Sequence, residues 1–131
     1  MADIGSRSDS GLSAIEKEIT AQAWTRLAPA LCDDLRIIQS EVNQGRAQLI
    51  AWGNAEFFTV LREEIAANGK ELVIVAAAGK NSIQYLDVIH KQAAAQGFAS
   101  VRLHTMRPDS MLRMGKSLGY QKAETILRAV L

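Results

Sequence analysis

The 131-residue sequence predicts an α/β fold built around a central βαβ unit. Residues 71–78, ELVIVAAA, form a continuous apolar stretch that is typical of a strand buried on both faces. Apolar residues with helical spacing follow until Gly97, and residues 99–105, ASVRLHT, have the character of a second strand. Because a helix with short connections joins the two strands, we expect them to be parallel.

Two helices are predicted ahead of this unit. Apolar residues recur at helical intervals over residues 15–27 and again over residues 31–42. We expect the two helices to be broken apart near Pro29, and Gly45 to end the second one. The single cysteine, Cys32, is predicted to be a small buried residue on a helix.

Residues 1–12, rich in Ser, Gly and Asp, are expected to form a disordered leader. The remaining residues, 13–131, are predicted to form one domain, with Ser13 and Glu16 at the spacing of a capping box.

A β-hairpin is predicted over residues 47–61, AQLIAWGNAEFFTVL, because Gly53 and Asn54 suit a tight turn between two β-prone runs. Trp52 and Phe57 flank this turn. If the turn projects from the body, these two aromatic side chains are candidates for an exposed self-association patch.

The C-terminal part of the sequence predicts a short helix that begins at Pro108 and ends at Gly119. Two further runs follow, YQKAE at residues 120–124 and TILRAVL at residues 125–131. We expect both to be strands that complete the sheet.

Composition excludes several classes of protein. The net charge of +1 gives no strong nucleic-acid signal, although residues 1–77 hold 7 basic and 11 acidic residues and residues 78–131 hold 8 and 3. No apolar run is long enough to span a membrane, so we expect a cytoplasmic protein without a membrane partner. One cysteine without a neighbouring histidine also predicts no metal site.

Two local patterns, IHKQAAAQGFASVRLHT at residues 89–105 and MLRMGKSLGY at residues 111–120, sharpen this picture. With the order of elements, they resemble the GNAT (Gcn5-related N-acetyltransferase) superfamily over residues 13–131. The resemblance implies a mixed, splayed β-sheet flanked by helices. It also implies an acyl-CoA site with the pyrophosphate at the N-terminus of the central helix, where free N–H groups favour an anion. Compact proteins of this kind occur in bacterial and phage genomes.

The connection after the central strand departs from that family. Its members carry a glycine-rich loop there, whereas this sequence reads AAGKNS, with Gly79 as its only glycine. The residues of this turn that we predict to hold acetyl-CoA or CoA, if the protein binds it, are Gly79, Lys80, Asn81 and Ser82. In the alternative interpretation Asn81 caps the helix, Gly79 makes the turn and Lys80 is solvated.

The catalytic residues implied by the resemblance are also missing. The family's general-acid tyrosine falls at Gly115, and its asparagine near the start of that helix falls at about Pro108. Tyr120 matches the family's structural aromatic residue. His104, near the end of a central strand, is the candidate base for proton removal from an amine.

Two functions follow from these patterns. The first is a degenerate GNAT-like protein that acts as a binding or assembly module, with a protein partner or as a homo-oligomer, and transfers no acyl group. The second is an acetyl-CoA-dependent N-acyltransferase that acts on an amine substrate through Gly79–Ser82 and His104.

Overall fold

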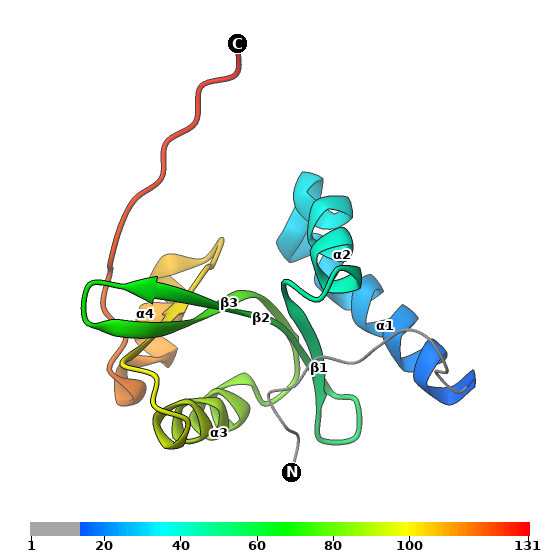
Figure 1. The fold of residues 1–131 in the computed structure, drawn as a ribbon, viewed down its shortest axis with the longest axis horizontal. Helices are drawn as coiled ribbons and strands as arrows, with labels where there is room; N and C mark the ends of the chain where they lie inside the picture. The colour runs from blue at the N-terminus through cyan, green and yellow to red at the C-terminus, as the bar shows by residue number, and fades with distance from the viewer. Residues whose placement is uncertain (1–13) are drawn as a thin grey trace.

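A mixed four-stranded β-sheet separates two helical layers in the computed structural model, which describes residues 14–131 (Figure 1). The predicted α/β class is confirmed, whereas the expected leader, residues 1–12, lies outside the described residues. The elements in chain order are α1 Ala14–Leu31, α2 Leu35–Asn43, β1 Gln48–Trp52, β2 Phe57–Ala66, β3 Gly69–Gly79, α3 Ser82–Ala95, β4 Ser100–Leu103 and α4 Pro108–Met114. Two 3₁₀ turns, Cys32–Asp34 and Lys116–Leu118, complete the described elements.

The strands lie in the order β1-β2-β3-β4. β1, β2 and β3 are antiparallel neighbours, and β4 pairs with β3 in parallel, as the βαβ pattern predicts. The parallel pairing joins residues 71–74 to residues 100–103, and a further bond runs from the His104 N–H to the Ile74 carbonyl. β3 then continues to Gly79 without β4 beside it.

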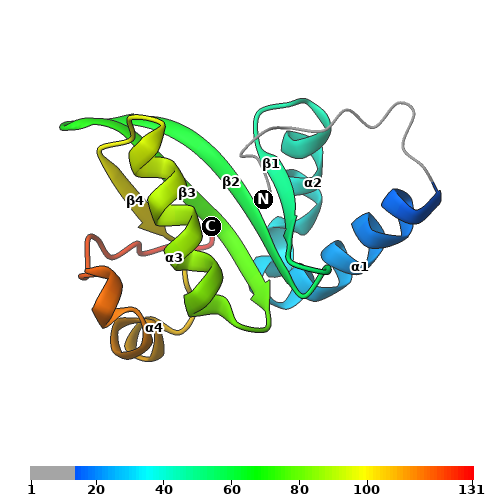
Figure 2. The same ribbon diagram turned by 90° about the horizontal axis from the view of Figure 1, so that it is seen from below.

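The sheet is buried on both faces, which explains the continuous apolar sequence of β3. α3 covers one face, where Leu86 and Ile89 pack against Leu72 and Ile74 (Figure 2). α1 and α2 cover part of the other face. The core on this second side contains Ala23, Leu27, Leu31, Ile38, Ala47, Phe58, Val60 and Ala76.

The break between α1 and α2 lies later than the sequence predicts. Pro29 lies inside α1, near its end, where a missing N–H interrupts only one helical hydrogen bond. The chain departs from helical geometry at Cys32, whose φ is +49°. Cys32 is exposed, so the prediction that it is a buried helical residue is wrong.

The predicted hairpin is formed by β1 and β2, with Trp52 paired to Phe57. Positive φ angles occur at Gly53 and Ala55 in its turn, and not at Asn54. Trp52 and Phe57 are 2% and 1% exposed, so the expected self-association patch at this turn is absent from the described surface. The indole N–H of Trp52 donates to the buried Thr59 hydroxyl at 2.9 Å, which satisfies its polar group inside the core.

The two predicted closing strands are not formed. Residues 120–131 contain no helix or strand and leave the body as an extended chain, drawn in red in Figure 1. A strand requires a neighbour for its backbone N–H and C=O groups, and no described strand pairs with this segment. Among residues 14–131, no helix has both the length and the apolar composition required to cross a bilayer.

Candidate functional site

The turn between β3 and α3 is tightly packed against the start of β2. Gly79 has a φ of +132° and is paired with Phe57, the first residue of β2. A Cβ atom on Gly79 would lie 2.7 Å from the Phe57 Cα and closer still to the Glu56 carbonyl oxygen. The N–H of Lys80 donates to the same carbonyl at 2.8 Å. Gly79 is therefore required here by the approach of two backbones.

Asn81 stands at the N-cap position of α3, but its side chain does not cap the helix. Its backbone is left-handed, with a φ of +58°, and its side-chain Nδ2 donates to Glu56 Oε1 at 3.2 Å. The Tyr85 hydroxyl donates to the same carboxylate oxygen. The Tyr85 ring stacks on Phe57, with 5.7 Å between centroids and 8° between planes, which fixes the hydroxyl beside Glu56.

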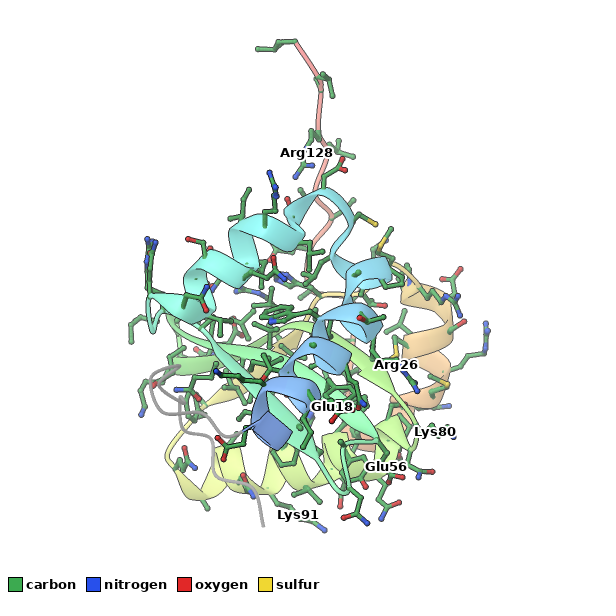
Figure 3. All side chains as sticks on the ribbon, turned by 90° about the vertical axis from the view of Figure 1, so that its right-hand side faces the viewer. Glu18, Arg26, Glu56, Lys80, Lys91 and Arg128 are labelled. Carbon is green, nitrogen blue, oxygen red and sulfur yellow. The ribbon has the colours of Figure 1, made fainter. Side chains whose placement is uncertain are left out.

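A carboxylate of the chain itself is thus placed beside the N-terminus of α3. The hydrogen bonds from Tyr85 and then Asn81, together with the charge of Lys80, lower the pKa of Glu56, so the side chain is ionised at neutral pH. The same carboxylate raises the pKa of Tyr85. Figure 3 shows Glu56 and Lys80 at the same end of the molecule.

The four predicted cofactor-binding residues, Gly79 to Ser82, lie together at this turn because they are consecutive. His104 is not brought to them. Its backbone bonds to Ile74, five residues before Gly79 along β3. The structure therefore does not place the predicted base beside the predicted cofactor-binding turn.

His104 has its own charged surroundings. Arg102 Nε donates to His104 Nε2 at 3.4 Å, so the neutral ring carries its proton on Nδ1. Burial lowers the pKa of His104, and the positive charges of Arg102 and Arg62 lower it further. The ring is neutral at pH 7, but its basic nitrogen is already engaged by Arg102.

Arg102 belongs to a charge network that the sequence did not reveal. It bonds to Glu71 at 2.7 Å and to Glu64 at 2.8 Å, and Arg62 joins Glu64 to Glu41 of α2. We call these five residues the β2–β4 charge network. Arg102 lowers the pKa of Glu64, and every charge in the network has an opposite partner.

A second missed contact joins α3 to the C-terminal segment. His90 Nε2 and the Tyr120 hydroxyl are 2.6 Å apart, and their rings meet edge to face with 5.0 Å between centroids. Burial raises the pKa of Tyr120 to about 12 and lowers the pKa of His90. The two neutral side chains share this hydrogen bond, and the pair anchors residue 120 to α3.

Gly115 leaves no room for a catalytic side chain. A Cβ atom at this position would lie 2.8 Å from the Met111 carbonyl oxygen and 2.8 Å from Tyr120 Cδ2. The position that would hold the general-acid tyrosine implied by the resemblance is thus filled by packing. No group of three or more His, Cys, Asp or Glu side chains within residues 14–131 is arranged to hold a metal ion.

Comparison with known proteins gives a likeness of fold. The crystal structure of TTHA1254 from Thermus thermophilus matches with a TM-score of 0.51 and 16% identity, over 84% of this chain and 91% of that chain. A point mutant of TTHA1254 matches with a TM-score of 0.53 and the same identity and coverage. No protein-family model matches the chain, and a search of curated proteins gives no match.

Proposed function

We propose that this chain is a degenerate GNAT-fold protein that acts as a binding or assembly module and transfers no acyl group. The observation that carries the proposal is the Glu56 carboxylate, which accepts hydrogen bonds from Asn81 and Tyr85 beside the N-terminus of α3. A pyrophosphate that approached this helix end would meet an ionised carboxylate, and like charges oppose binding.

Two further features support the same function. The backbone contact between Gly79 and Glu56 closes the turn on one side, so the loop is not a bare cradle of N–H groups. The residues proposed for proton transfer are also unsuited to it, because Gly115 has no side chain and His104 Nε2 accepts from Arg102. The chain thus lacks both side-chain groups that would accelerate the proton transfers of acyl transfer.

Calorimetric titration with CoA and acetyl-CoA tests the proposal. We expect no saturable heat from the wild-type protein up to about millimolar ligand, which corresponds to a binding free energy weaker than about −4 kcal/mol. The informative variant is Lys80→Glu, and its matched control is Lys91→Glu, an equal charge change further along α3.

Micromolar binding that Lys80→Glu abolishes and Lys91→Glu preserves would contradict the proposal and favour the acetyl-CoA-dependent N-acyltransferase. A second pair of variants tests the role assigned to Glu56. If its charge excludes the ligand, Glu56→Gln gains measurable binding, whereas Glu18→Gln on α1, an exposed position, does not.

A further inference from the structure

The C-terminal segment, residues 125–131, has the sequence of a strand but no strand neighbour. In TILRAVL, Leu127, Ala129 and Leu131 alternate with Ile126, Arg128 and Val130, so an extended backbone would have one wholly apolar face. Leu127 is 90% exposed and Val130 is 91% exposed. An apolar, β-prone segment of this length held in water is a docking element or an aggregation site.

The edge of the sheet at β4 is open to pairing with such a strand. This strand lies at the edge of the sheet, with β3 on one side and no described strand on the other. Val101 and Leu103 extend the apolar face of β3 beneath α3, yet both remain partly exposed. A neighbouring strand with an apolar face would complete their burial and would pair the free N–H and C=O groups of the edge.

The segment of the same chain does not lie along this edge. Tyr120 packs on His90, on the α3 face of the sheet, whereas Glu124 approaches Arg102 at 3.9 Å on the opposite face. Residues 121–123 therefore connect the two faces, and Glu124 lies next to Arg102 of β4. Residues 125–131 then extend away from the body, and Arg128 stands clear of the sheet and helices (Figure 3).

We propose that residues 125–131 add as a strand to the β4 edge of a second copy of this chain. The partner is a second copy for a geometric reason. Each segment leaves its own body next to β4, so in a two-fold arrangement it meets the β4 edge of the neighbouring copy. Both copies then exchange segments. This inference rests on the proposed function and identifies the partner of the binding module as a second copy of the chain. In such a dimer, each copy's residues 125–131 would pair with the β4 edge of the other copy, so no segment and no edge would stay unpaired.

Multi-angle light scattering of the full-length protein across a range of concentrations tests this assembly. We expect twice the monomer mass for the wild-type protein. Because successive N–H groups of a strand point to opposite sides, either Ile126→Pro or Leu127→Pro removes a hydrogen bond to β4. We expect at least one of these variants to weaken the dimer at least tenfold, which is about 1.4 kcal/mol.

The matched control is Ile37→Lys, which changes another exposed apolar residue, on α2, and should leave the dimer unchanged. A wild-type monomer up to about 200 μM would overturn the inference, since a specific interface of this kind binds more tightly than that. A dimer that tolerates both proline variants would also overturn it. So would a monomer whose residues 125–131 are protected from hydrogen exchange, because the segment would then pair within its own chain.

Failure of this assembly is distinguishable from failure of the proposed function. A monomer that binds no CoA would leave the module hypothesis with another partner. Micromolar CoA binding by a strand-exchanged dimer would contradict the proposed function and leave the assembly intact.

Discussion

Replacing Gly79 with alanine tests whether the turn before α3 is held by the approach of β2. The added Cβ would lie 2.7 Å from the Phe57 Cα, and a backbone atom has no rotamer by which to move away. A φ of +132° lies outside the left-handed α region and costs an alanine about 1–3 kcal/mol. Forcing a methyl group into packed structure costs about 1–3 kcal/mol more. We therefore expect Gly79→Ala to lower the free energy of unfolding by about 2–6 kcal/mol.

Gly97 supplies the matched control because its φ is +87° but a Cβ there would meet no atom within 4 Å. Gly97→Ala should thus lower the free energy of unfolding only by the cost of its positive φ, about 1–2 kcal/mol. Urea unfolding followed by tryptophan fluorescence measures both variants. Equal losses, within about 0.5 kcal/mol and at the same denaturant dependence, would refute the claim that backbone contact fixes this turn.

Three further predictions concern the core, the two histidines and the charge network. Thr59→Val removes the acceptor of the buried Trp52 N–H and should cost about 1–3 kcal/mol in urea unfolding, whereas Thr25→Val at an exposed site should be nearly neutral. The pKa values of His90 and His104 are lowered in the folded protein, so protonation favours the unfolded chain, and unfolding free energy should fall as pH drops below about 6.5. A flat profile from pH 7.5 to 5.5, or the same decline in the double variant His90→Gln/His104→Gln, would be evidence against this assignment. Arg102→Met leaves Glu64 and Glu71 without their shared cation and should destabilise by about 1–3 kcal/mol in thermal or urea unfolding, with partial recovery when Glu71→Gln is added. Additive losses in the double variant would exclude this coupling.

Periodicity predicted most of the fold because burial imposes it directly. The apolar run of β3, the helical spacing of α3 and the short connections between them specify a parallel pair, and that pair is present. The predictions were wrong where the packing of the folded chain outweighed a local sequence signal. Pro29 fits within the last turns of α1, and the break falls at Cys32, whose positive φ no pattern indicates. Residues 125–131 have strand propensity without a neighbour in the same chain.

The sequence indicated where the candidate turn lies in the chain but not which side chains surround it. The position of residues 79–82 follows from the strand and helix that they join, since Gly79 ends β3 and Ser82 begins α3. Glu56 was missed because it lies 25 residues from Asn81 in sequence and reaches it through the register of β2 and β3. The β2–β4 charge network was missed for the same reason, since cross-strand pairs depend on register.

The most direct test of the central claim is a nuclear magnetic resonance titration that follows the backbone amides of Gly79 to Ser82 as CoA is added. These amides belong to the turn at the N-terminus of α3, so they report on the site itself and not on the protein as a whole. With Glu56 ionised beside this turn, we expect no saturable shift of these four signals up to about millimolar CoA. Saturable shifts confined to these amides at micromolar CoA would show that the turn holds the cofactor and that the Glu56 carboxylate does not exclude it.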